Sequence, residues 1–364
     1  MIVKKAEKAG KKFLFSLLGL LIKRASTLPP SDVHLNEISK IVLIRQDNRL
    51  GNLIILTPLI RAIKDFFPRS QLSIVVGERY HELFLKDPYI DDILIFGQRK
   101  FLRSPFALIS FLSKLGRKRF DMAIDAGNMG SFSFNNGFLT YFTKARYRIG
   151  YRRGRSELLL NVPVPPITDV RTEREVFLNL LEYVVQRKFD SSTHLCLSDE
   201  EEGEFRRDME KLGVKDSDFI VGIHPGGRYD KKWGVDNFLN LAKRIIDNFP
   251  FKIFIFAGSA ERDEIEIFST LDRSKIHIFF SRPLRKFMGT VNRCNLFVSG
   301  DTGPMHMAVA LGVPTLEIFL VDNYQRYGYS GNGYNLAVYS KNPSVHDVYR
   351  KFVELIEKMD SSLS

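Results

Sequence analysis

Short runs of apolar and β-branched residues alternate with longer amphipathic stretches along most of this chain, and the alternation occurs twice. The first series opens with an expected strand at residues 38–44 and an expected helix at 53–67. The second opens with an expected strand at 219–223 and an expected helix at 235–248. Strands that alternate with helices pair in parallel, with helices on both faces of the sheet. The sequence therefore predicts an α/β protein with two doubly wound, Rossmann-like domains.

The other expected elements continue this rhythm in both halves. Further strands are expected at residues 72–76, 93–96, 122–124, 252–257, 275–279, 296–298 and 315–319. Further helices are expected at residues 81–86, 106–115, 174–187, 199–212, 262–271, 284–292, 304–311 and 345–359. The segment 147–169 is rich in Arg, Pro and Gly and interrupts the rhythm, which places a domain boundary near residues 165–175.

A chain of 364 residues is long enough for two domains. The predicted divisions are a basic segment with a linker at 1–30, domains at 31–170 and 171–344, and a C-terminal helix and tail at 345–364. In parallel sheets of this kind, ligands bind at the carboxyl ends of the strands. Two such sheets facing each other would form a cleft between them, so functional residues are expected in the loops that follow strands.

Half of the net charge of +12 lies in residues 1–24, where Glu7 is the single acidic residue. This segment holds the apolar run 13–22, with lysines before it and Lys23 and Arg24 after it. About 20 apolar residues are needed to span a bilayer, so the run is too short. The pattern is typical of an interfacial helix on an anionic membrane surface, in preference to a cleaved signal peptide. Packing of the helix on the protein or on a partner remains an alternative.

The loop at residues 299–306 reads SGDTGPMH and follows an expected strand. Its two glycines let the backbone approach a ligand closely, and the helix start that follows is a natural anion site. The candidate ligand-binding residues here are Asp301, Thr302, Gly303 and His306. The alternative is an ordinary loop in which Asp301 or Thr302 caps the helix.

Two more loops of the second half could complete an anion site. The loop at residues 224–233 reads HPGGRYDKKW, in which Gly226 and Gly227 free the backbone and Lys231 and Lys232 supply cations suited to a diphosphate. In the loop at 256–261, Glu261 either accepts hydrogen bonds from ribose hydroxyls or caps the next helix. Together the loops predict a binding site for a nucleotide-diphosphate sugar.

The loop at residues 45–52 reads RQDNRLGN and points into the same cleft from the first half. An acceptor sugar is expected here, close to Arg45, Arg49 and Gly51, and its hydroxyl must lose a proton to attack the donor. Arg152 belongs to a basic cluster at 146–155 that could meet phosphorylated glycan or lipid headgroups. A solvated basic loop explains that cluster equally well.

These segments together resemble glycosyltransferase family 9, the ADP-heptose:lipopolysaccharide heptosyltransferases and their relatives. The matching segments are residues 41–45, 50–51, 57–62, 224–226, 231–233, 301–306 and 310–315. The resemblance implies a GT-B fold and inverting transfer of a sugar, with no metal and no cofactor. It favours ADP-heptose as the donor and a lipopolysaccharide core or related glycan as the acceptor. It also implies that Lys231 contacts the donor phosphates, and that the protein lies on the cytoplasmic face of the inner membrane.

The chain departs from the family pattern at Asn52, where the family commonly has an acidic residue proposed as the general base. A neutral amide cannot take up the proton. The base is therefore expected to be Asp47, five residues earlier, or else Asp125 at the end of an expected strand. A third alternative is that Asn52 only orients the acceptor. A non-catalytic relative that binds nucleotide sugars or glycans is the alternative.

Other classes of function are disfavoured. Without residues 1–24 the chain is only mildly basic and has no aromatic RNA-binding signature, so nucleic acid is not an expected partner. The Gly-x-Gly at 331–333 opens no helix, which disfavours a dinucleotide oxidoreductase. The Asp-x-Asp at 216–218 precedes a strand, which disfavours a metal-dependent GT-A enzyme. Cys196 and Cys294 lie in no metal-binding or redox spacing.

Overall fold

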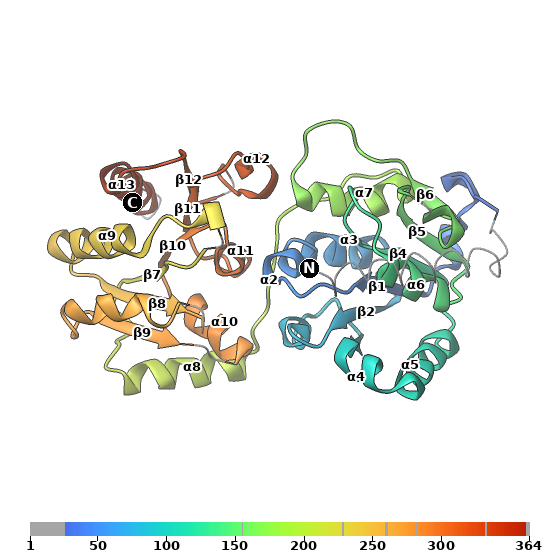
Figure 1. Ribbon diagram of the computed structural model, residues 1–364, viewed down its shortest axis with the longest axis horizontal. Coiled ribbons are helices and arrows are strands. Elements are labelled where there is room, and N and C mark those ends of the chain that lie inside the picture. The colour runs from blue at the N-terminus through green and yellow to red at the C-terminus, as the bar shows by residue number, and fades with distance from the viewer. Residues whose placement is uncertain are drawn as a thin grey trace.

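The computed structural model describes residues 26–361, except Arg155, Arg228, residues 259–260, residues 281–282 and Asn332. Two parallel six-stranded sheets form the centre of the described chain, as the sequence predicts, and helices cover both faces of each sheet (Figure 1). The expected interfacial helix in residues 1–24 lies outside the described residues. Within the described part of the chain, no helix is long and apolar enough to cross a membrane.

The first sheet has the strand order β3-β2-β1-β4-β5-β6. Its strands are β1 (Lys40–Arg45), β2 (Gln71–Gly77), β3 (Asp92–Phe96), β4 (Met122–Asp125), β5 (Tyr147–Tyr151) and β6 (Val162–Val164). Its α-helices are α2 (Leu50–Ile54), α3 (Thr57–Phe66), α4 (Gln98–Arg103), α5 (Pro105–Arg117), α6 (Phe134–Phe142) and α7 (Glu173–Val185). Short 3-10 helices are η1 (Pro30–Asp32), η2 (Leu35–Glu37), η3 (His81–Phe84) and η4 (Ser156–Leu158).

The second sheet has the strand order β12-β11-β10-β7-β8-β9. Its strands are β7 (Ile220–His224), β8 (Lys252–Ala257), β9 (Ile276–Phe280), β10 (Leu296–Gly300), β11 (Thr315–Phe319) and β12 (Asn335–Tyr339). Its α-helices are α8 (Asp199–Lys211), α9 (Val235–Asn248), α10 (Leu284–Asn292), α11 (Gly303–Ala310), α12 (Tyr324–Tyr327) and α13 (Val345–Asp360). Two 3-10 helices, η5 (Tyr229–Lys231) and η6 (Glu264–Thr270), follow β7 and β8.

The single helix expected at residues 53–67 is wrong, because the chain forms α2 and α3 with a break between them. Pro58 lacks the N–H that a continuous helix would donate to the carbonyl of Ile54. The hydroxyl of Thr57 donates to that carbonyl instead, at 2.8 Å. The break ends α2 after five residues. A helix this short is not stable by itself, so α2 depends on its packing against the rest of the protein.

The segment 147–169, expected to interrupt the rhythm, contains β5 and β6. Pro163 is tolerated because β6 is the edge strand and pairs only with β5 within the described sheet. The helices α4, α6 and α12 and the strand β12 were not expected, nor were the short 3-10 helices η1, η2, η4 and η5. The expected helices at 81–86 and 262–271 are the 3-10 helices η3 and η6.

The helix α7 follows the predicted domain boundary in sequence but packs against α3 of the first half. Phe177 and Leu181 of α7 lie in the same buried cluster as Leu59 and Ile63 of α3. The C-terminal helix α13 packs on α9 and beside β12 of the second half. The position of the boundary remains a prediction, whereas the contacts attach α7 to the first sheet and α13 to the second.

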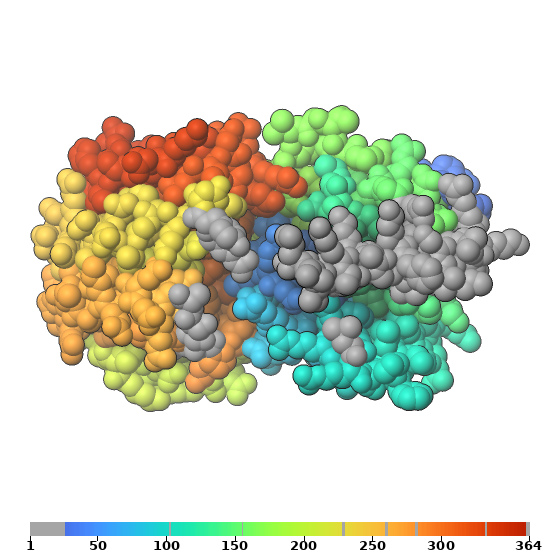
Figure 2. All heavy atoms as spheres, in the orientation of Figure 1, coloured from blue at the N-terminus to red at the C-terminus, as the bar shows by residue number. Residues whose placement is uncertain are grey.

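The two halves meet where α2 faces α11, and the space-filling view shows them in contact along the middle of the molecule (Figure 2). Glycines make this contact close. A Cβ added to Gly51 would lie 2.6 Å from Cδ2 of His306, and a Cβ added to Gly303 would lie 3.0 Å from Cβ of Leu50. Neither position leaves room for a larger side chain, so the loops after β1 and β10 are held together at this junction.

Candidate active site

The carboxylate of Asp301, directly after β10, is the centre of the polar contacts in the second half. Its Oδ2 accepts hydrogen bonds from the ammonium of Lys231 and from the amide of Asn323, the latter at 2.6 Å. The side chain of Asp301 is 8% exposed, whereas that of Lys231 is 34% exposed. The buried carboxylate therefore holds a cation that a ligand can still reach from solvent.

The loop after β7 brings Lys231 to Asp301 by close backbone packing. The amide of Gly226 donates to Nδ1 of His224 at 3.1 Å, and a Cβ on Gly226 would lie 2.3 Å from Cε1 of that ring. A Cβ on Gly227 would lie 2.9 Å from the carbonyl oxygen of Lys231. Burial lowers the pKa of His224 to about 4, so the ring is neutral and accepts this bond. Both glycines are needed for the turn itself.

The start of α11 is not capped by a side chain. Thr302 occupies the N-cap position, but its hydroxyl bonds the hydroxyl of Ser299 at 3.0 Å. Asp301, the other candidate cap, bonds Lys231 and Asn323 as described above. The capping alternative therefore does not describe this loop, and the positive end of the α11 dipole lies beside Asp301 and Lys231.

His306 lies one turn into α11 and is buried at the junction of the halves. Its Nδ1 bonds the hydroxyl of Tyr329 at 2.9 Å, and its Nε2 lies 3.8 Å from Oδ1 of Asp301. Burial lowers the pKa of His306 to about 4, against the opposing effect of Asp301. The ring is therefore neutral at pH 7, and it lines the space between Gly51 and Asp301.

Two predicted donor residues have other partners in the structure. Lys232 forms an ion pair with Glu264 at the start of η6. Of the two lysines, Lys231 is the one that pairs with Asp301. Glu261 accepts a hydrogen bond from the amide of Gly258 at 2.9 Å, within its own loop. This bond is not the predicted helix cap, since Asp263 occupies the N-cap position of η6 and no side chain caps it. The contact of Glu261 with a ribose remains a prediction.

On the first half, Asp47 is the centre of the loop after β1. It accepts hydrogen bonds from the guanidinium of Arg45 at 3.0 Å, from the amide side chain of Asn52 at 2.7 Å and from the backbone N–H of Arg49 at 3.0 Å. The side chain of Asp47 is 15% exposed. Asn52 thus orients the carboxylate five residues before it.

The other acceptor-side residues differ in access. Arg45 is buried, donates to the carbonyl of Ala126 at 2.6 Å and lies 4.9 Å from the ring centroid of Phe177. Burial lowers the pKa of Arg45 from its usual value. Arg49 and Arg152 are exposed. The buried Arg45 therefore stabilises the protein through these contacts, whereas Arg49 and Arg152 are accessible to a ligand.

Asp125 ends β4 beneath this loop and is fully buried. It accepts hydrogen bonds from Arg153 at 3.1 Å and from the amide of Gly127 at 2.9 Å. Burial is the largest influence on Asp125 and raises its pKa. A carboxylate that is enclosed and paired in this way cannot contact an acceptor without a rearrangement of the loop.

Sequence reasoning missed a polar cluster behind the donor-side loops, formed by residues of α7, β11 and the segment after α12. Glu317 is buried in β11 and accepts from the backbone N–H of Tyr329 at 3.0 and 3.1 Å. Burial raises the pKa of Glu317 to about 8. An acidic residue inside an apolar strand was the available signal. The same signal did not exist for Asn323 and Arg174, whose contacts arise only in the folded chain.

A model described as glycosyltransferase family 9 (heptosyltransferase) matches residues 108–351, two thirds of the chain. The chain belongs to glycosyltransferase family 9. Among curated proteins, this family 9 chain is 21% identical to lipooligosaccharide heptosyltransferase 2 of Haemophilus ducreyi over 300 residues, which cover 75% of this chain and 80% of the relative. The protein is therefore a glycosyltransferase, as the resemblance implies.

Solved structures show the same fold. The family 9 glycosyltransferase of Veillonella parvula superposes with a TM-score of 0.72 at 19% identity, covering 83% of this chain and 86% of that one. The ADP-heptose lipopolysaccharide heptosyltransferase II of Escherichia coli superposes with a TM-score of 0.71 at 16% identity, covering 88% and 99%. The two sheets of this family 9 protein therefore form a GT-B fold, which confirms the predicted architecture.

Proposed function

We propose that the protein transfers a heptose from ADP-heptose to a lipopolysaccharide core or related lipid-linked glycan, with inversion and without a metal ion. Support for the sugar and the acceptor comes from the names of the relatives, which are heptosyltransferases of lipooligosaccharide and lipopolysaccharide. Support for the chemistry comes from one observation in this chain, the pairing of Lys231 with the buried Asp301 beside the start of α11.

On the donor side, Lys231 would bind the diphosphate while Asp301 holds the ammonium in place. A cation and a helix N-terminus together stabilise the charge that develops on the leaving ADP. Asn323 keeps Asp301 oriented through its 2.6 Å hydrogen bond. Because the electrostatic stabilisation comes from these groups, the leaving diphosphate needs no metal ion in this proposal.

On the acceptor side, Asp47 would take the proton of the attacking hydroxyl. The acceptor oxygen forms a bond to the anomeric carbon from one face as the bond from that carbon to the diphosphate oxygen breaks on the other, so the configuration inverts. Asp47 is preferred over Asp125, which is fully buried and paired with Arg153. Asn52 donates to Asp47 and therefore serves as an orienting group rather than as the base.

The proposal retains the membrane setting expected from the sequence. A lipid-linked acceptor lies at the surface of a bilayer, and a basic amphipathic segment such as residues 1–24 would hold the enzyme on the anionic cytoplasmic leaflet of the inner membrane. This part of the proposal rests on the sequence and on the chemistry of the acceptor.

Calorimetric titration of ADP tests the donor site. Lys231→Ala is expected to weaken ADP binding by roughly tenfold to a hundredfold, because a hydrogen bond to a charged group is lost. The matched control is Lys351→Ala, which also removes a lysine from an ion pair with a carboxylate, on α13. Equal affinity of the wild type and both variants would remove Lys231 from the donor site.

A further inference from the structure

The segment from Gln98 to Phe120 carries seven cations and no acidic residue, and most of it lies on the outside of the first half. In Figure 2 the corresponding cyan atoms form the lower edge of that half. We define the α4–α5 surface by the exposed cationic and large apolar side chains of this segment, which are Arg99, Lys100, Arg103, Phe106, Ile109, Lys114, Arg117 and Arg119. Such a concentration of one charge on adjacent helices creates a local positive field.

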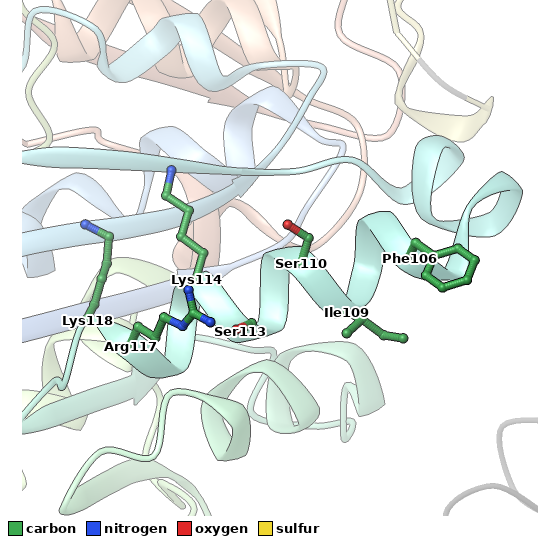
Figure 3. A pocket seen from close by; sticks show the side chains of 7 residues that line it. All are labelled: Phe106, Ile109, Ser110, Ser113, Lys114, Arg117 and Lys118. Atoms are coloured by element: carbon green, nitrogen blue, oxygen red, sulfur yellow. The ribbon is translucent and has the colours of Figure 1, made fainter.

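The helix α5 has two distinct faces. Leu115 is buried and Phe111 and Leu112 pack against the same apolar cluster, which also contains residues of β1 and β2. The outer face carries Phe106, 83% exposed, and Ile109, 62% exposed. Figure 3 shows these two side chains at one end of α5 and Lys114, Arg117 and Lys118 at the other. An open groove of about 670 Å³ runs along this face.

Exposed apolar side chains beside cations are typical of helices that lie in the headgroup region of a bilayer. A contiguous exposed apolar patch rimmed by polar residues marks a contact surface, whereas a single exposed apolar residue does not. Phe106 and Ile109 are three residues apart on one helix and are both exposed. A soluble phosphorylated ligand would satisfy the cations but would leave Phe106 and Ile109 in water. An anionic lipid surface satisfies both ends of the face at once.

We propose that the α4–α5 surface docks on an anionic lipid bilayer. Phe106 and Ile109 enter the headgroup boundary, and Lys114 and Arg117 lie against the lipid phosphates. The helix of 13 residues is about 20 Å long, so it lies flat on the surface and does not cross it. This contact is separate from any made by residues 1–24, and it does not depend on the identity of the donor sugar.

The position of the surface suits an enzyme whose acceptor is anchored in lipid. The helix α4 begins after β3, at the same edge of the sheet as the loop that holds Asp47. A Cβ added to Gly77 would lie 3.2 Å from Oδ1 of Asn48, and one added to Gly97 would lie 2.6 Å from a carboxylate oxygen of Glu78. The loops after β1, β2 and β3 are thus packed in sequence from the acceptor site to α4.

Co-sedimentation of the full chain with vesicles tests the proposal. The vesicles contain phosphatidylcholine alone or with phosphatidylglycerol. Replacement of Lys114 and Arg117 by Gln is expected to lower partitioning to the anionic vesicles by at least about tenfold, because each cation near the surface contributes on the order of 1 kcal/mol. Replacement of Lys211 and Lys243 by Gln, on α8 and α9, is the control with the same change of charge. Equal losses in the two double variants would overturn the proposal.

A fluorescence measurement distinguishes this surface from residues 1–24. Trp233 is the only tryptophan of the chain, is buried and donates to the carbonyl of Pro343, so its emission is a constant background. With anionic vesicles, Phe106→Trp is expected to show a shift to shorter wavelengths and quenching by brominated acyl chains. Val170→Trp, at an equally exposed position, is expected to show neither.

Vesicle binding without a change in emission of Phe106→Trp would overturn the proposal, because another segment would then make the contact. If the surface instead binds an acidic protein, Phe106→Trp would likewise show no change in emission with vesicles. ADP titration of the Lys114 and Arg117 double variant should give the affinity of the wild type, which separates this proposal from the assignment of the donor site.

Discussion

The guanidinium of Arg174 lies over the ring of Tyr329, with its central carbon 4.0 Å from the ring centroid. Arg174 belongs to α7, which packs on the first half, whereas Tyr329 follows α12 in the second. Arg174 also donates to the carbonyl of Gly328 at 3.0 Å. The hydroxyl of Tyr329 bonds His306. The contact of Arg174 with Tyr329 therefore connects the first half to the donor-side histidine.

Arg174→Gln is expected to lower the free energy of unfolding by about 1–3 kcal/mol, because it removes a buried cation–π contact and a charged hydrogen bond. Chemical denaturation measures the change. Arg171→Gln is the control, since Arg171 pairs with the exposed Asp169 two residues away and should change the stability little. Equal changes in the free energy of unfolding for the two substitutions would show that the contact of Arg174 with Tyr329 does not stabilise the protein.

Because of Glu317, the free energy of unfolding is expected to fall as the pH rises. Its pKa is raised to about 8 in the folded chain, from an ordinary value of 4.5. The folded state therefore binds more protons than the unfolded state between these values, and the contribution is lost as the pH rises toward 8, by about 1.4 kcal/mol per unit. His306, with its pKa lowered to about 4, acts oppositely and only below about pH 6.5.

Thermal unfolding between pH 7 and 8 isolates the effect of Glu317. The wild type is expected to lose stability over this range relative to Glu317→Gln, which keeps the neutral shape and cannot ionise. Glu357→Gln, at an exposed position on α13, should retain the pH dependence of the wild type. Parallel curves for the wild type and Glu317→Gln would contradict the raised pKa.

Asp47→Asn is expected to lower kcat by roughly a hundredfold or more while ADP binds normally, because proton transfer loses its base. Asn52→Asp would place a second carboxylate at the atoms that now lie 2.7 Å apart. Like charges at that distance raise the pKa of one of them, so the acid limb of the pH–rate profile should move to higher pH. Steady-state kinetics measures both, with Asp65→Asn on α3 as the control. Full activity of Asp47→Asn would exclude Asp47 as the base.

The alternation of strands and helices predicted both sheets except the strands β5, β6 and β12, because local periodicity determines which segments can be buried strands. It also located the loops that carry Asp301, Lys231 and Asp47, since these follow strands directly. The periodicity could not reveal β6, a three-residue edge strand that contains Pro163. Nor could it reveal that Asp125 would be enclosed by Arg153, or that Arg174 would lie over Tyr329, because such contacts join residues far apart in the chain.

Heptose transfer is tested directly by an assay with purified protein, ADP-heptose, a lipopolysaccharide-core acceptor and excess EDTA. ADP release is measured together with the anomeric configuration of the product by NMR. We expect one ADP released per heptose transferred, an inverted anomeric centre, undiminished activity in EDTA and loss of transfer in Asp47→Asn. Retention of configuration, or a requirement for added metal ion, would contradict the proposed function, as would the absence of transfer by protein that binds ADP-heptose.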